Sequence, residues 1–124
     1  MILCDTNIII DFYKGDPTIV SNLKSIGQEN IAVSIITVGE LLFGVLNKRE
    51  LNQIRSDLDQ LKVIHLNEAI GEMFIQMMSK YVLSHRLSLP DGLIAATALT
   101  EGIPLFTRNH RDFKYIRGLE LFVK

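Results

Sequence analysis

The sequence opens with a short apolar segment that ends on a carboxylate. Three apolar residues stand in a row from Met1, and this run predicts a short buried strand. Asp5 ends the run, and Thr6 and Asn7 follow it with side chains that can cap a helix. A central parallel strand that gives way to a helix does so at the carboxyl edge of its sheet, where open α/β folds bind ligands. We therefore take Asp5 as the predicted centre of a metal site.

Strands and helices are predicted to alternate along the rest of the chain. Capping residues and helical spacing of apolar residues predict helices over 8–13, 16–26, 37–45, about 50–61, 67–84 and 89–101. Short apolar runs predict strands over 31–34, 63–66 and 104–107, and a short edge strand over 119–122. Thr37 is the predicted cap of the third helix, with Glu40 completing a capping box. The order implies a three-layer α/β/α sandwich with a mainly parallel sheet.

Length, charge and cysteine content limit the classes of function. A chain of 124 residues with 48% hydrophobic residues suits a single domain over 1–124. The net charge of -1 excludes a strongly basic nucleic-acid binder, so a polyanion must be held by a local patch or by metal ions. Cys4 is the only cysteine, which excludes an internal disulfide. Asp5 interrupts any signal-peptide pattern, and no uncharged run approaches the roughly 18 apolar residues of a membrane span. We expect a soluble, cytoplasmic protein.

Three carboxylates, Asp5, Glu40 and Asp91, lie close to predicted helix starts. The helix dipole stabilises an acid there by about 0.3–1 kcal/mol, which by itself is a sufficient structural explanation for any one of them. Asp91 shares its side of the helix with Ile94 and Ala95, which should face the sheet. An unpaired charge on that side is costly without a cation or hydrogen-bond donors. The same cost applies to Asp5, because it directly continues a buried strand. Glu40 lies opposite the apolar side of its helix, so a solvent-facing capping role would also explain its presence.

A fourth contributor is expected from the loop after the fourth predicted strand. Asn109 offers a neutral carbonyl oxygen and Asp112 a charged one, although an ordinary loop or capping role is an equal alternative for Asp112. Thr6 and Thr107 are candidates for hydrogen bonds to the carboxylates or to a metal-bound water, or for cap and turn roles. Oxygen ligands without His or Cys favour Mg²⁺ or Mn²⁺. Such sites bridge to phosphates and activate water, so the predicted chemistry is hydrolysis of a phosphodiester.

Four segments along the chain carry a family resemblance. They are Ile2-Leu-Cys-Asp5-Thr6-Asn7, Ser34-Ile-Ile-Thr37-Val-Gly39-Glu40-Leu-Leu-Phe-Gly44, Leu89-Pro90-Asp91-Gly-Leu-Ile-Ala95-Ala-Thr-Ala98 and Leu105-Phe-Thr107-Arg-Asn109-His-Arg-Asp112-Phe113. In this order they resemble the PIN-domain ribonucleases, and most closely the VapC-like toxins of bacterial toxin–antitoxin pairs. The resemblance implies a PIN-like parallel strand order 3-2-1-4-5 and an Mg²⁺- or Mn²⁺-dependent endoribonuclease with Asp5, Glu40 and Asp91 as its acids. Asn109 stands where many relatives carry a fourth acid, which leaves the second metal open.

The resemblance also implies protein partners. Relatives of this kind are neutralised by a small antitoxin that lies in a groove formed by the early helices. The matching surface here comprises Phe12, Tyr13, Phe43 and Leu46, for which internal packing is the alternative. Homodimers are usual in the family, and the methionine-rich segment 73–78 is a candidate for that interface, although a core role is favoured for it.

Basic residues gather beside the predicted site. Arg108, Arg111 and Lys114 are candidates for contacts with RNA phosphates, which position the backbone without reading sequence. A solvated basic surface is the equal alternative for a cluster this short. His65, His85 and His110 show no catalytic pairing, and a metal-activated water requires no histidine base.

Three other functions compete with the nuclease. A haloacid-dehalogenase-like phosphatase needs a second acid two positions after Asp5, where Asn7 stands. A response-regulator receiver domain needs an acceptor aspartate after the third strand, where the chain has Leu66 and Asn67. The remaining alternative is a catalytically silent PIN-like binding module that acts through a protein partner, which Asn109 keeps open.

Overall fold

A parallel sheet of four strands lies at the centre of the computed structural model, which describes residues 1–123. Its strands are β1 (Ile2–Cys4), β2 (Ile31–Ser34), β3 (Lys62–Ile64) and β4 (Leu105–Phe106). They lie in the order β3-β2-β1-β4, and every pairing between them is parallel. Leu3 of β1 pairs with Ala32 of β2 on one side and with Leu105 of β4 on the other. The predicted parallel sheet is confirmed, and β1 occupies its middle.

The helices follow the predicted order, with shifts at some ends. Within residues 1–123 they are α1 (Thr6–Tyr13), α2 (Pro17–Ile26), the 3-10 helix η1 (Gln28–Asn30), α3 (Ile35–Phe43), α4 (Lys48–Leu58), α5 (Glu68–His85), α6 (Leu89–Glu101) and α7 (His110–Phe113). α1 begins at Thr6 because Asp5 caps it, and α4 begins before Glu50 because Asn47 caps it. No helix among the described residues is both long enough and apolar enough to serve as a membrane span.

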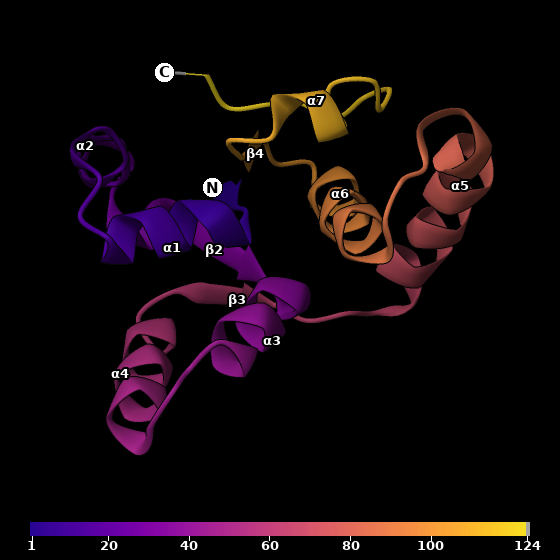
Figure 1. Ribbon diagram of the computed structural model, residues 1–124. Coiled ribbons are helices and arrows are strands. Elements are labelled where there is room, and N and C mark those ends of the chain that lie inside the picture. The colour runs from indigo at the N-terminus through magenta and orange to yellow at the C-terminus, as the bar shows by residue number, and fades with distance from the viewer. Residues whose placement is uncertain (124) are drawn as a thin grey trace.

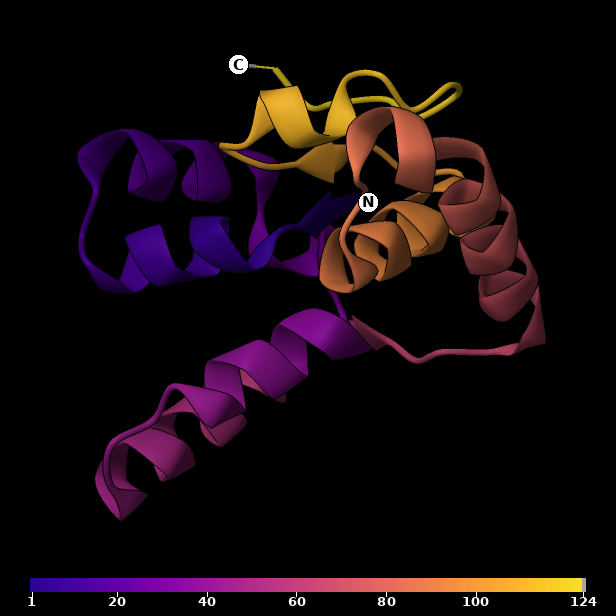
Figure 2. The same cartoon turned by 45° about the vertical axis from the view of Figure 1, so that its right-hand side comes forward.

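Helices cover both faces of the sheet, because side chains of successive strand residues point to opposite faces. Figure 1 shows α1, α2 and α4 on the left of the sheet and α5 and α6 on the right, and Figure 2 shows the same two groups after rotation. The face towards α5 and α6 is formed by Leu3, Ala32, Ile64 and Leu105. The face towards α1 and α2 is formed by Cys4, Ile31, Val33 and Phe106. The predicted three-layer α/β/α sandwich is confirmed.

The strands predicted over 63–66, 104–107 and 119–122 were wrong in extent, the second being β4 over Leu105–Phe106. The third strand ends at Ile64 instead of continuing over His65 and Leu66, because its neighbour β2 ends at Ser34, the partner of Ile64. The predicted edge strand over 119–122 is reduced to a single parallel bridge between Leu121 and Leu105. β4 is only two residues long, so it offers little backbone for a fifth strand to pair with.

Close packing of α5 against α6 fixes the start of α6. A Cβ atom on Gly92 would lie 2.9 Å from Met78 Sδ and 3.1 Å from Phe74 Cε1. The two helices can therefore pack this closely because Gly92 has no side chain. Met77 is buried, and Met73, Phe74 and Met78 pack against the same core. The favoured core role of segment 73–78 is confirmed, and its part in a homodimer stays a prediction.

Candidate metal centre

Asp5 lies at the carboxyl end of the central strand and is the most deeply buried acid of the site. It is 6% exposed. Its Oδ1 accepts a hydrogen bond of 2.8 Å from the Thr6 backbone N–H, and its Oδ2 accepts one of 2.8 Å from the Thr107 hydroxyl. The first bond caps α1 and the second joins Asp5 to the segment after β4. The carboxylate is therefore held in one orientation by the start of α1 and by the segment after β4.

Glu40 reaches the same edge of the sheet from α3. Thr6 donates from its hydroxyl to Glu40 Oε1 at 2.6 Å, and the Thr37 hydroxyl lies 3.0 Å from Thr6 Oγ1. The predicted capping role of Thr37 was wrong. Ser34 caps α3 instead, since its Oγ accepts from the Thr37 N–H at 3.2 Å, which leaves Thr37 buried inside the helix. Glu40 is exposed, but Thr6 binds its carboxylate, so it does not act as a helix cap.

Asp91 lies in the first turn of α6, whose cap is Ser88. The Asp91 N–H donates to Ser88 Oγ at 3.3 Å, and the side chain of Asp91 is half-buried. Burial, and then the charge of Asp5, raise the pKa of Asp91 to about 6, against the lowering effect of its hydrogen bond with Ser88. The charges of Asp112 and Glu40 raise the Asp91 pKa further. The charges of Asp5, Glu40 and Asp112 therefore all act on the Asp91 carboxylate.

The pKa of Asp5 responds to the same group of acids. Burial raises it most, and the hydrogen bonds from Thr107 and Thr6 lower it. The negative charges of Glu40 and Asp112 then raise it again. Asp5, Glu40, Asp91 and Asp112 thus form one electrostatic cluster, although they come from four separate segments of the chain.

The loop after β4 contributes an acid and a threonine to the cluster. Thr107 is buried, and besides donating to Asp5 it accepts from the Asn109 N–H at 3.0 Å. The side chain of Asn109 makes no capping hydrogen bond to α7 and is exposed. Asp112 is also exposed, but its charge acts on Asp5 and Asp91. The loop therefore adds the charge of Asp112 to the cluster, while the backbone N–H of Asn109 joins it through Thr107.

The basic residues of this loop do not neutralise the cluster. Arg108 is held by two ion pairs on the other side of the loop, with its Nε 3.3 Å from Asp11 and its Nη1 3.3 Å from Asp16. Arg111 and Lys114 are exposed. Over residues 1–123, no lysine, arginine or histidine forms an ion pair with Asp5, Glu40, Asp91 or Asp112.

The cluster fits a hard divalent cation by its chemistry. Carboxylates that raise each other's pKa values without a basic partner are stabilised by a cation, and their oxygens suit Mg²⁺ or Mn²⁺. Among residues 1–123, no three His, Cys, Asp or Glu side chains lie close enough together to form a ready-made ligand cage. The site is therefore a loose group of four acids at one edge of the sheet. Asp5 and Asp91 are its less exposed members.

Comparison with known proteins gives the family. The PIN domain model matches residues 2–119. The chain belongs to the PIN-domain family. Toxin FitB of Neisseria gonorrhoeae is 32% identical, and the alignment covers 91% of each chain. The tRNA(fMet)-specific endonuclease VapC of Shigella flexneri is 27% identical over 94% of this chain and 92% of its own.

Chains in two solved structures share almost the whole fold. A toxin–antitoxin complex from Klebsiella pneumoniae contains a chain that is 31% identical, with a TM-score of 0.82, covering 96% of this chain and 95% of that one. The FitAcB structure from Neisseria gonorrhoeae gives a TM-score of 0.83 at 29% identity, covering 99% and 97%. The four predicted motifs therefore lie in a PIN domain, as the resemblance implied.

Two serines of the PIN-domain site escaped the sequence analysis. Ser34 was assigned to a strand and Ser88 to no predicted element, yet each caps the helix that carries an acid of the site. A signal was present, because each serine stands three residues before the amide that it caps, Thr37 and Asp91 respectively. These caps set the starts of α3 and α6 and so the directions of Glu40 and Asp91.

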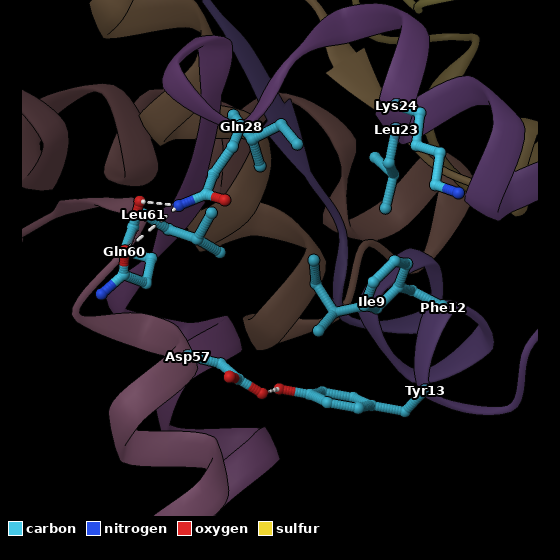
Figure 3. A pocket seen from close by; sticks show the side chains of 10 residues that line it. Ile9, Phe12, Tyr13, Leu23, Lys24, Gln28, Asp57, Gln60 and Leu61 are labelled. Atoms are coloured by element: carbon cyan, nitrogen blue, oxygen red, sulfur yellow. Dashed lines mark hydrogen bonds between the residues drawn. The ribbon is translucent and has the colours of Figure 1, made fainter.

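The side chains of the predicted partner surface are exposed at the ends of α1 and α3. Phe12 and Tyr13 are 41% and 43% exposed, and Phe43 and Leu46 are 93% and 87% exposed. Tyr13 donates its hydroxyl hydrogen to Asp57 and so joins α1 to α4 (Figure 3). Cavities of about 370 Å³ and 460 Å³ lie on the two sides of Tyr13. Internal packing is thus excluded for Phe43 and Leu46, whereas Phe12 and Tyr13 are partly packed against the protein.

Proposed function

We propose that this PIN domain is a metal-dependent endoribonuclease and the toxin of a toxin–antitoxin pair. The observation that carries the proposal is the cluster of Asp5, Glu40 and Asp91 with Asp112, which has no basic partner among residues 1–123. Relatives named ribonucleases and tRNA endonucleases, and neighbours solved as toxin–antitoxin complexes, support the reaction and the partner class.

Asp5, Asp91 and Glu40 would hold Mg²⁺ or Mn²⁺ in this proposal. A cation held by these residues would supply Lewis-acid chemistry for hydrolysis of a phosphodiester. The protein supplies the placement. Thr6 and Thr107 hold the carboxylates of Glu40 and Asp5, and Ser88 fixes the turn that carries Asp91.

The exposed bases of the loop would hold the RNA backbone. Arg111 and Lys114 flank Asp112 and are free to contact phosphates, since neither forms an ion pair within residues 1–123. Arg108 has a different role, because its guanidinium ties the loop to Asp11 and Asp16. We assign substrate contact to Arg111 and Lys114, and loop positioning to Arg108.

The antitoxin would cover the surface formed by Phe12, Tyr13, Phe43 and Leu46. Large apolar side chains that are exposed together mark interaction sites in soluble proteins. The two cavities beside Tyr13 would receive the partner's apolar side chains. A homodimer and an intracellular location remain part of the proposal and follow from the family alone.

Cleavage of single-stranded RNA by purified, partner-free protein tests the proposal. Wild type with Mg²⁺ or Mn²⁺ should cut the RNA, EDTA should abolish cutting, and Asp5→Asn and Asp91→Asn should lose about 100-fold or more, the scale of one lost electrostatic contact. Asp59→Asn is the matched control, because Asp59 is exposed at the end of α4. Titration of Mn²⁺ into RNA-free protein should show weaker binding in both site variants. Equal cleavage by wild type and Asp5→Asn would contradict the proposal.

Expression in a bacterial host tests the toxin role with the same variants. Wild type and Asp59→Asn should arrest growth, whereas Asp5→Asn should not, because arrest requires cleavage. Arrest by Asp5→Asn at equal protein level would separate toxicity from the acid cluster.

A further inference from the structure

An ordered aromatic stack stands beside the acid cluster and has no part in the chemistry described above. The rings of His85 and Tyr115 are parallel within 5°, with centroids 3.8 Å apart. Tyr81 packs its ring edgewise against both, at 6.0 Å from His85 and 5.1 Å from Tyr115. Tyr81 is buried, and its hydroxyl oxygen accepts from the Arg117 N–H at 3.0 Å. The stack is therefore anchored in the core at one end.

His85 is the outer ring of this stack. It is exposed, whereas Tyr115 is half-buried and Tyr81 is buried. The ring contacts of His85 within residues 1–123 are with the two tyrosines, so the imidazole face opposite Tyr115 has no ring against it. Ser84 Oγ lies 2.8 Å from His85 Nδ1 and fixes the rotation of the ring. The structure thus presents a flat, oriented ring to solvent.

The stack borders the proposed cleavage site. His85 ends α5, and only residues 86–88 separate it from α6, where Ser88 caps the turn that holds Asp91. Tyr115 follows α7, which carries Asp112. Burial, and then the charges of Asp91 and Asp112, raise the pKa of Tyr115. The inner ring of the stack is therefore within electrostatic reach of two acids of the cluster.

Basic residues adjoin each ring of the stack in the sequence. Arg86 follows His85 directly and is exposed, and Lys114 precedes Tyr115 and is exposed. Lys80 Nζ lies 5.5 Å from the centroid of the Tyr81 ring. Proteins that bind single-stranded nucleic acid combine flat rings, on which bases stack, with basic residues that follow the backbone.

We propose that the exposed face of His85 stacks against an unpaired base of the RNA substrate, next to the phosphate that the acid cluster cleaves. This inference rests on the proposed ribonuclease function and adds a positioning residue to it. Tyr115 supports the imidazole from behind, and Arg86 and Lys114 are placed to contact the neighbouring phosphates. Because an unpaired base is required, the site favours single-stranded RNA over the same sequence in a duplex.

Binding of a fluorescently labelled single-stranded RNA in EDTA tests the stack without cleavage. His85→Ala should weaken binding by about 5- to 100-fold, the range reported by alanine substitution at base-stacking positions. His85→Phe should restore binding to within about 2-fold of wild type, because it keeps a flat ring. His65→Ala is the matched control, since His65 is an exposed histidine beyond the end of β3. Melting temperatures of all variants verify that they are folded.

An abasic scan of the RNA separates base stacking from a structural role of His85. A single abasic position moved along the oligonucleotide should weaken binding by wild type at one position, and that penalty should disappear in His85→Ala. A histidine that only joins α5 to the α7 segment would give the same abasic profile in both proteins. That result, or equally weak binding by His85→Phe and His85→Ala, would overturn the inference.

The two proposals fail in different ways. If the ribonuclease proposal fails, wild type does not cut RNA with Mg²⁺ or Mn²⁺. If only the stacking proposal fails, wild type cuts RNA while His85→Ala binds RNA in EDTA as tightly as His65→Ala does.

Discussion

The two faces of the sheet are packed to different degrees. On the face covered by α5 and α6, Gly92 fits because it has no side chain, with Met78 Sδ only 2.9 Å from the position of a Cβ atom. On the face covered by α1, α2 and α4, cavities of about 370 Å³ and 460 Å³ remain, and Phe12 and Tyr13 are exposed. The tightly packed face holds Asp91 in place, whereas the open face has apolar surface for a partner to cover.

Under the proposed function, the comparison explains how one small domain serves two purposes. A catalytic acid requires a fixed position, which dense packing provides. A binding surface requires exposed apolar groups, which lower the stability of the free protein. Separate faces of the sheet satisfy both requirements, and the acid cluster lies at the edge between them. Three predictions test this division.

The largest effect is expected from truncating the packed face. Ile94→Ala should lower the free energy of unfolding by about 2–5 kcal/mol, because Ile94 is 1% exposed and leaves a cavity. Phe12→Ala on the open face should cost about 1 kcal/mol or less, because Phe12 is already 41% exposed. Urea unfolding of the two variants measures the difference. Equal losses would show that the faces are packed alike.

A pH-dependent effect is expected at the edge between the faces. The pKa of Asp91 is raised from its ordinary value of 3.8 to about 6 by burial first and by Asp5 second, so the folded protein binds a proton more tightly than the unfolded chain. The stability due to this proton is present at low pH and is lost as pH rises from about 4 to about 6. In EDTA, Asp91→Asn should therefore gain stability relative to wild type over that interval.

Urea unfolding from about pH 4 to about pH 7 measures this gain. Glu72→Gln is the matched control, because it removes an exposed carboxylate of α5. Addition of Mg²⁺ at neutral pH should stabilise wild type more than Asp91→Asn. A pH-independent difference between Asp91→Asn and wild type would place Asp91 outside the acid cluster.

The smallest effect is expected within the open face. Burial and the hydrogen bond to Asp57 raise the pKa of Tyr13, so its hydroxyl stays protonated and donates to Asp57. Tyr13→Phe removes that bond and should cost about 1 kcal/mol or less. Asp57 keeps its other bond, from Gln53 at 3.0 Å. A double-mutant cycle of Tyr13→Phe with Asp57→Ala measures the coupling between α1 and α4, and a coupling of zero would show that the bond does not join them.

The sequence predicted the fold and the less exposed members of the site for physical reasons. Apolar runs and caps predict strands and helices because they act within a few residues of one another. Asp5 and Asp91 were singled out because each is a charged residue among apolar residues that were predicted to be buried. Glu40 was more ambiguous, because its helical phase placed it opposite the apolar side chains of α3. Its hydrogen bond from Thr6 spans 34 positions and cannot be derived from local spacing.

The chain alone therefore determined what short-range patterns encode: a parallel α/β fold, the order of its elements and two acids that burial makes conspicuous. Tertiary structure alone decided that Thr6 binds Glu40, that Arg108 pairs with Asp11 and Asp16, and that His85 meets Tyr115. These outcomes depend on residues far apart in the chain, which only the packing of helices on the sheet brings together. Local patterns predict how exposed a side chain should be, but only the tertiary fold determines which distant residue it contacts.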